Sequence, residues 1–339
     1  SPLLSIVHCV DTVVWMDQMS SILSIDRHAK TVTVQAGATL AQLNRALEAE
    51  GLAFSNLPSV SGQTIGGAIA TATHGSGMRA GLLSSAVLAL EIATPAKGVL
   101  RLTRASSSPL FWAACCSLGV LGVVTEVTLQ VEDAYALSVE QEPRTLDDVL
   151  VNFESVARSA EYVRFWWYPH TDWVLLNTAD RVPPALAPPP RRPSLLSRLL
   201  SRVRFNVLQS ALLASWIVTP LVPIINRVWR WLYFSSRARA IVCPIQFFNF
   251  DCLFMQHVDE WAVPLSEAAA ALTGLRSLIE FRGYRAHFPV EVRFVPRDSV
   301  WLSNAHERDV VYIGVISYRP FGIDIQDFRK YFADFDALM

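Results

Sequence analysis

Hydrophobic and polar residues alternate in several short stretches of the chain, and a period of two indicates β-strands. ILSID (22–26) and TVTVQAG (31–37) flank the polar RHAK, so they predict a hairpin in which Val32 and Val34 face a core. VVTEVTLQVE (123–132) alternates in the same way, and AVLALEIAT (86–94) indicates a buried strand. The first third of the chain therefore contains strands.

Other stretches have the period and the end signals of helices. Thr39 with Gln42 three residues later forms a capping box, and Gly51 is a typical residue just beyond a helix end. The apolar stripe between them consists of Leu40, Leu43 and Leu47. A second helix is expected to begin with Ser108 as its N-cap and to stop at Gly119. Strands and helices together predict an α+β fold.

The composition changes near residue 132, where aromatic stretches such as EYVRFWWYPH (161–170) begin. Two later stretches, FPVEVRFV (288–295) and VVYIGVISY (310–318), again alternate as strands do. We therefore expect two domains, residues 1–131 and residues 132–339, which is consistent with the length of the chain.

The second expected domain contains an unusual segment at about residues 194–234. It follows a proline-rich stretch, carries arginines among leucines, and has no charged residue from Phe205 to Asn226. Tryptophans suited to the headgroup layer of a membrane lie within or beside it, namely Trp216, Trp229 and Trp231. Pro220 and Pro223 interrupt the segment. We interpret it as membrane-associating; the alternative is an ordinary buried hairpin.

The overall composition supports a large core and excludes some classes of function. Hydrophobic residues make up 52% of the 339 residues and charged residues 17%, and the formal net charge is −1. A chain with this charge has no global attraction to nucleic acid, so no nucleic-acid partner is expected. The five cysteines are odd in number and form no C-x-x-C motif, which argues against a disulfide framework and a zinc site. No metal site is predicted.

The glycine-rich stretch SGQTIGGAIATATHGSGMRAG (61–81) is the first candidate for chemistry. It offers backbone N–H groups and hydroxyls with little side-chain bulk, which suits a pyrophosphate or a flat ring system. It is not a dinucleotide fingerprint, because GSGMRAG is one residue too long. The alternative is a tight crossover packed with small residues. His74 lies in this stretch but proves nothing alone.

Glu291 and Arg293 are the second candidate. They are two residues apart on an expected strand, so they share one face while Val290, Val292 and Phe294 share the other. The carboxylate could accept hydrogen bonds from the hydroxyls of a polyol, and the guanidinium could stabilise a developing oxyanion. The alternative is a solvated ion pair on the surface of a strand.

The order of these motifs resembles that of the aldonolactone oxidases, a family of vanillyl-alcohol-oxidase (PCMH-type) flavoproteins. The similarity rests on residues 21–77, on LGVVTEV (121–127), on FMQHVDEWAVP (254–264) and on the stretch 288–322. It implies an FAD-binding domain in residues 1–131 and an α+β cap domain in residues 132–339. It also implies FAD contacts from Thr73, His74, Gly75, Ser76, Gly77, Gly81, Ser84 and Val124, and a catalytic set of Glu291, Arg293 and Ser76, with small residues leaving room for the flavin.

The reaction implied by the resemblance is the oxidation at C2 of an aldono-1,4-lactone of the L-gulono type, with O2 as acceptor. Its products would be ascorbate or an analogue and hydrogen peroxide. The resemblance also implies a membrane-associated enzyme, with the endoplasmic reticulum as its expected location. Two motifs of the family, Gly-x-Gly-His-Ser and His-Trp-x-Lys, are expected just before Ser1 and just after Met339, so we interpret the chain as incomplete. A membrane-associated protein without activity, a dehydrogenase that uses cytochrome c and another nucleotide-binding module remain alternatives.

Overall fold

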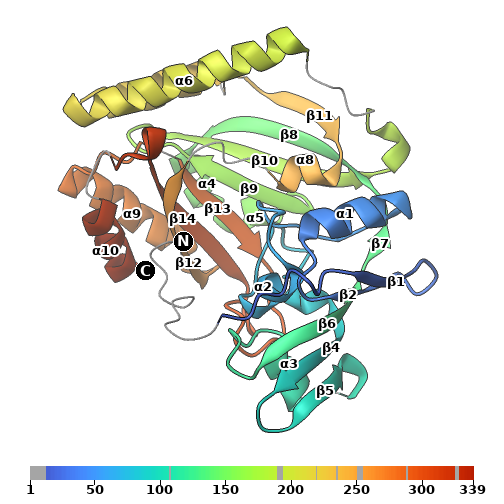
Figure 1. The fold of residues 1–339 in the computed structure, drawn as a ribbon. Helices are drawn as coiled ribbons and strands as arrows, with labels where there is room; N and C mark the ends of the chain where they lie inside the picture. The colour runs from blue at the N-terminus through green and yellow to red at the C-terminus, as the bar shows by residue number, and fades with distance from the viewer. Residues whose placement is uncertain are drawn as a thin grey trace.

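Two antiparallel sheets form the framework of the molecule (Figure 1). The computed structural model describes residues 13–106, 108–188, 194–218, 220–233, 236–249, 255–287, 289–324 and 328–339. Among the residues considered above, Cys9, Arg191, Arg192 and Cys252 lie outside the described parts.

The first sheet has five strands in the order β1-β2-β6-β4-β5. Their bounds are β1 Ile22–Asp26, β2 Thr31–Gln35, β4 Val87–Thr94, β5 Gly98–Thr103 and β6 Val123–Gln130. The helices and the small sheet beside it are α1 Leu40–Ala49, α2 Ile65–Ala70, α3 Pro109–Ala114, β3 Leu52–Ala53 and β7 Glu132–Asp133. The expected hairpin is confirmed, because β1 pairs with β2 and the side chains of Val32 and Val34 are fully buried.

The end signals of α1 are also confirmed. The hydroxyl of Thr39 accepts a hydrogen bond from the backbone N–H of Gln42, whose side chain accepts one from the N–H of Thr39. Gly51 follows the helix with a φ of 70°. The second helix begins at Pro109 as expected but ends at Ala114, before Gly119. Leu118 already has a φ of 51°, a left-handed conformation that a helix does not accommodate.

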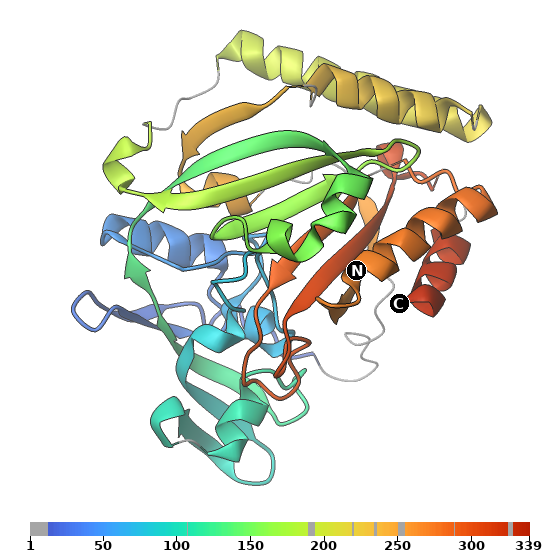
Figure 2. The same ribbon diagram turned by 180° about the vertical axis from the view of Figure 1, so that it is seen from behind.

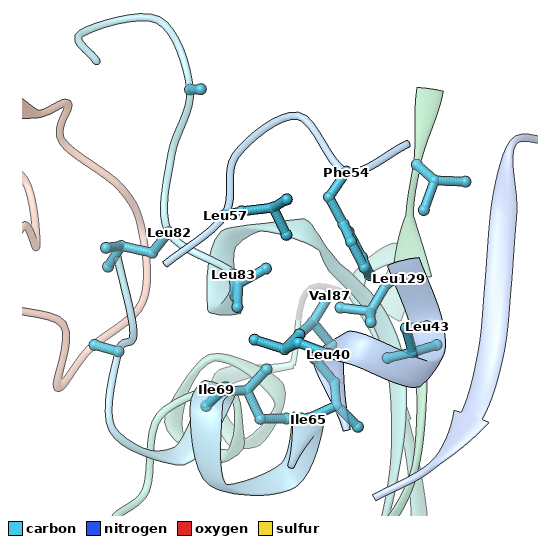
Figure 3. Close-up of a cluster of buried hydrophobic side chains, with 14 of the residues drawn as sticks. Leu40, Leu43, Phe54, Leu57, Ile65, Ile69, Leu82, Leu83, Val87 and Leu129 are labelled. Atoms are coloured by element: carbon cyan, nitrogen blue, oxygen red, sulfur yellow. The ribbon is translucent and has the colours of Figure 1, made fainter. Parts of the chain in front are cut away.

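The core of this region lies between the sheet and the helices α1 and α2 (Figure 3). Leu40 of α1 lies next to Ile65 of α2, and Leu43 lies beside Leu129 of β6. The same cluster of buried residues continues into the second sheet through Tyr162, Val295, Val310 and Tyr312. The two sheets therefore share a continuous apolar contact.

The second sheet has seven strands in the order β11-β8-β10-β9-β13-β14-β12, all paired antiparallel. Their bounds are β8 Ala136–Thr145, β9 Tyr162–Trp167, β10 Trp173–Val182, β11 Ala238–Val242, β12 Gln256–Pro264, β13 Val290–Val295 and β14 Val310–Tyr318. Its helices are α4 Leu146–Val151, α5 Phe153–Ala157, α8 Pro244–Phe248, α9 Ala268–Arg282 and α10 Phe328–Leu338. The fold is α+β, as predicted.

One face of the seven-stranded sheet is covered by α4, α5, α9 and α10, and their side chains form a second apolar core with the sheet (Figure 2). Val163, Val292 and Phe294 belong to this core. Because side chains alternate between the faces of a strand, their neighbours Arg164, Glu291 and Arg293 lie on the opposite face. That face is turned toward the first sheet.

The segment interpreted as membrane-associating forms two helices, α6 Leu195–Ile217 and α7 Leu221–Tyr233. They lie at the end of the molecule opposite to β4 and β5 (Figure 1). Within the described parts of the chain, no helix combines the length and the apolar character needed to cross a bilayer. The alternative of an ordinary buried hairpin does not describe α6 and α7 either. The first half of α6 exposes large apolar side chains, and Leu195 is 83% exposed.

Candidate active site

The candidate site is a cavity of about 620 Å³ where the polar face of the seven-stranded sheet meets two loops that flank α2, residues 58–63 and 71–74. It is bordered by Pro58, Ser59, Val60, Gln63, Thr71, Ala72, Thr73, His74, Gln256, Val258, Glu260, Glu291, Arg293, Asn304, Tyr312 and Ile316. Most of these side chains can form hydrogen bonds. The cavity therefore suits a small polar ligand better than a lipid or a steroid.

Glu291 and Arg293 project from β13 into this cavity as a buried ion pair. The Nη2 atom of Arg293 lies 2.6 Å from Oε2 of Glu291 and 2.5 Å from Oγ of Ser59, across the contact between the two sheets. Oε1 of Glu291 is buried and has no hydrogen-bond partner within the described residues. The interpretation as a solvated surface pair is wrong, and an unused acceptor remains for a bound molecule.

A second buried arginine, Arg164, was not recognised from the sequence. It lies on β9 directly opposite Arg293 in the strand register, and it donates a hydrogen bond of 2.6 Å to the carbonyl of Phe247. Burial, with a smaller effect from the charge of Arg293, outweighs the opposing effect of Glu291 and lowers the pKa of Arg164 to about 10. Arg164 does not border the cavity itself, but it places a second guanidinium behind the pair of Glu291 and Arg293.

His74 is fixed from three sides at the other wall of the cavity. Its ring stacks on that of Tyr312 with 3.6 Å between the centroids, and its Nδ1 lies 3.0 Å from the carbonyl oxygen of Gly75. Its Nε2 lies 3.1 Å from Oε2 of Glu260 on β12. Glu260, like Glu291, pairs across the sheet with Gly314, so the two carboxylates are in one row on the same face. Glu260 was also missed, because only the strand pairing brings it near His74.

Glu260 is expected to make stability depend on pH. Burial alone would raise the pKa of Glu260, but His74 and Arg293 outweigh that effect and hold it at about 2, below the ordinary 4.5. The folded protein thus binds this proton less readily than the unfolded chain, so ionised Glu260 stabilises the fold above pH 4.5 and loses this contribution toward pH 2. Urea unfolding of wild type and Glu260→Gln should show a stability gap that shrinks over this interval.

The exposed Glu48→Gln on α1 is the matched control and should unfold like the wild type at each pH. If the gap between wild type and Glu260→Gln stays constant from pH 6 to pH 3, the assigned interaction of Glu260 is wrong.

The loop around Ser76 is packed tightly against the start of β9 and against Asn56. A Cβ atom on Gly75 would lie 1.9 Å from Oδ1 of Asn56, and one on Gly77, whose φ is +128°, would lie 2.4 Å from the carbonyl oxygen of Glu161. Ser76 donates a hydrogen bond to the carbonyl of Val163 and is buried. These glycines therefore admit close approach of protein atoms, and the flavin contacts expected of them stay predictions.

The predicted cofactor and catalytic residues are thus only partly brought together. Thr73, His74, Glu291 and Arg293 border the cavity, whereas the hydroxyl of Ser76 faces the backbone of β9 and does not. Gly81 and Ser84 follow along the same loop, and the buried hydroxyl of Ser84 has no partner among the described residues. Val124 lies apart on β6, where it pairs with Ile92. Contacts of these residues with a cofactor stay predictions.

The described residues fit a bound flavin together with a small substrate. The stacked rings of His74 and Tyr312 give the cavity a flat aromatic wall, and the buried acceptor of Glu291 requires a donor that the described protein does not supply. Both observations are expected of a site that is completed by a ligand.

Comparison with solved structures gives the fold, and a family match then gives the class of protein. The chain resembles a variant of cholesterol oxidase from Brevibacterium sterolicum, with a TM-score of 0.66 and 16% identity, covering 95% of this chain and 69% of that one. A solvent-stable cholesterol oxidase gives a TM-score of 0.63 with 18% identity, covering 88% of this chain and 66% of that one. At these identities the likeness shows the fold alone. Residues 3–103 match a family described as an FAD binding domain, and the protein is an FAD-dependent oxidoreductase.

Sequence comparison then gives the family. Residues 127–339 match the family described as D-arabinono-1,4-lactone oxidase. The L-gulonolactone oxidase of Scyliorhinus torazame is 37% identical, with 98% of this chain and 75% of the relative covered, and that of Mus musculus is 36% identical, with 94% and 72% covered. A D-arabinono-1,4-lactone oxidase of Yarrowia lipolytica is 29% identical, with 96% and 72% covered. The chain belongs to the aldonolactone oxidase family, whose members oxidise lactones with FAD.

Proposed function

We propose that the protein oxidises an aldono-1,4-lactone of the L-gulono type at C2, with dioxygen as the electron acceptor. The observation that carries this proposal is the buried pair Glu291–Arg293, which borders a polar cavity in a member of a lactone oxidase family. The products would be ascorbate or a close analogue and hydrogen peroxide. We also take residues 1–131 as the FAD-binding domain and residues 132–339 as the cap domain.

In this proposal FAD, when bound, supplies the acceptor for the hydride from C2. Arg293 would hold an oxygen of the lactone and stabilise the negative charge that develops on it, while Arg164 adds positive charge behind it. Oε1 of Glu291 would accept a hydrogen bond from the substrate hydroxyl and then take its proton. Ser59 holds the guanidinium of Arg293 in place across the domain contact. Thr73 and His74 would border the flavin ring.

An assay with a panel of lactones tests this proposal. Native-length protein loaded with FAD should consume O2 and form an equal amount of hydrogen peroxide with L-gulono-1,4-lactone, and less with lactones of other configuration at C2. Electron transfer to cytochrome c without O2 consumption would reject the oxidase assignment. Absence of any turnover with the whole panel would reject the proposed substrate class.

We further propose that the protein associates with a membrane through α6 and α7, with the endoplasmic reticulum as the expected location. One face of the first half of α6 is apolar and exposed, and it consists of Leu195, Leu196, Leu199, Leu200, Val203 and Val207. Arg198 and Arg202 flank this face by helical periodicity. The opposite face of α6, with Leu208 and Leu212, packs against the protein. This arrangement is typical of a helix in the plane of a bilayer surface.

The double substitution Leu199→Glu/Val203→Glu should therefore weaken binding to lipid vesicles by at least about ten-fold, because two apolar side chains lose their place in the lipid. Co-sedimentation with vesicles measures this effect. Val151→Glu is a matched control, since Val151 is exposed on α4, away from the hairpin. Equal losses in both variants, or none in either, would contradict the proposed docking face.

A further inference from the structure

A second polar cavity, of about 520 Å³, lies between α7, α9 and the turn that joins β9 to β10. Its lining includes Trp167, whose side chain belongs to the core on the helix-covered face of the seven-stranded sheet. Glu291 and Arg293 lie on the other face. This cavity is therefore separate from the lactone site, and the proposed reaction makes no use of it.

The cavity gathers positive charge that is not neutralised within the described parts of the chain. Arg227 and Arg230 project from α7, and neither forms an ion pair with a described carboxylate. The guanidinium carbon of Arg230 lies 3.5 Å from the centre of the Trp173 ring, and the buried Nε of Arg230 has no hydrogen-bond partner among those residues. A planar guanidinium held in this way is pre-organised for an acceptor with several oxygens.

His170 adds a further unsatisfied group at the turn. The turn is held by hydrogen bonds from the side chains of Trp167 and Thr171. The backbone of His170 has a φ of 65° there, a left-handed conformation that few residues other than glycine adopt. The buried Nε2 of His170 has no partner in the described chain. Burial, together with the charges of Arg285 and Arg227, lowers the pKa of His170 to about 4, so the ring is neutral near pH 7 and can donate from this atom.

The remaining charges at the cavity leave a positive balance. Arg276 is paired with Asp147 at 2.7 Å, and the two carboxylates that line the cavity, Asp172 and Glu280, are both exposed. The lining thus holds three arginines, Arg227, Arg230 and Arg276, and two carboxylates, Asp172 and Glu280.

We propose that this cavity binds a phosphate monoester group. A phosphate monoester carries close to two negative charges and three acceptor oxygens, which match two guanidiniums and an imidazole N–H. A free phosphate compound and the headgroup of a phosphorylated lipid share this chemistry. The position of Arg227 and Arg230 on α7, beside the proposed membrane-docking helix α6, makes both sources accessible. The site does not depend on lactone oxidation.

Calorimetric titration of the FAD-loaded protein with inorganic phosphate tests the site first. The wild type should bind saturably, Arg227→Gln should weaken binding about ten-fold, and Arg227→Lys should weaken it less. Because Arg227 is exposed, its replacement does not threaten folding, and lactone oxidation should be unchanged. Arg202→Gln, on an exposed position of α6, is the matched control and should bind phosphate like the wild type. Absence of saturable binding, or equal weakening in the control, overturns the proposal.

Vesicle binding then distinguishes the two sources. Phosphatidylcholine vesicles that contain a phosphatidylinositol phosphate are compared with vesicles brought to the same charge with phosphatidylserine. A preference for the phosphoinositide that Arg227→Gln abolishes supports the site with a lipid headgroup as its ligand. Equal binding to both vesicles, with phosphate binding retained, supports the site with a soluble phosphate compound as its ligand.

Discussion

Replacing Arg293 with methionine is expected to lower kcat/KM for the lactone by roughly 10²–10³-fold, the effect of removing one donor from an oxyanion site. The guanidinium is buried and bonded to Glu291 and Ser59, so it is already held where it would meet the substrate. Its loss also leaves the carboxylate of Glu291 buried without its ion-pair partner, which is energetically costly. Steady-state kinetics with L-gulono-1,4-lactone measures the effect.

Two further variants test whether the loss of activity is specific to the guanidinium of Arg293. Arg293→Lys keeps the charge but not the planar fork, so it should recover only part of the activity. Arg101→Met removes an exposed arginine of β5 from the first sheet and should leave kcat/KM within about two-fold of the wild type. If Arg293→Met retains most of the wild-type kcat/KM, the pair Glu291–Arg293 does not carry the reaction.

Gly75→Ala is expected to destabilise the protein by about 3 kcal/mol and to impair the lactone site at the same time. A Cβ atom at this position would lie 1.9 Å from Oδ1 of Asn56 and 2.6 Å from the carbonyl oxygen of Leu57, so the loop must move. The same Asn56 atom accepts hydrogen bonds from the backbone N–H groups of Leu57 and Ser76. Thermal or urea unfolding measures the loss of stability, and flavin absorbance of the purified protein measures cofactor retention.

Gly62→Ala is the control for this substitution. Gly62 lies in the same glycine-rich stretch, and a Cβ atom there would meet no described atom within 4 Å. It should fold and retain flavin like the wild type. Similar losses in the two variants would mean that the close contact with Asn56 is not the reason for glycine at position 75.

Local structure was the part of the fold that the sequence could predict. The capping box at Thr39, the hairpin of β1 and β2 and the alternation in β13 depend on residues close together in the chain, and all three are confirmed. The end of α3 was predicted too late, because no residue type forces Leu118 into a positive φ. The order of strands in the two sheets depends on contacts between distant residues, which no short pattern records.

For the site, too, the sequence could predict what depends on neighbouring residues but not what depends on contacts between distant strands. The period of two placed Glu291 and Arg293 on one face. Their burial depends on residues far away in the chain, such as Ser59, so the interpretation as a surface pair was reasonable from the sequence alone. Arg164 and Glu260 enter the site only through the pairing of β9 with β13 and of β12 with β14. The alternation of Arg164 with buried Val163 and Phe165 was the one available signal.

In the glycine-rich loop, two predicted residues lie at the cavity, but the reason for the small residues was predicted only in part. Thr73 and His74 do border the cavity, as the pattern of small residues suggested. Gly75 and Gly77, however, are small because Asn56 and Glu161 approach them closely. Composition shows that something must come near the backbone, but not whether it is a ligand or another part of the protein.

Anaerobic mixing of the FAD-loaded protein with L-gulono-1,4-lactone tests the central claim most directly, because it isolates hydride transfer from the step that uses oxygen. The account predicts rapid loss of the oxidised-flavin absorbance in the wild type, slowed by roughly 10²–10³-fold in Arg293→Met while the oxidised spectrum before mixing stays the same. Unchanged flavin absorbance in the wild type after mixing, or equally fast loss in Arg293→Met, would contradict a lactone site built on Glu291 and Arg293.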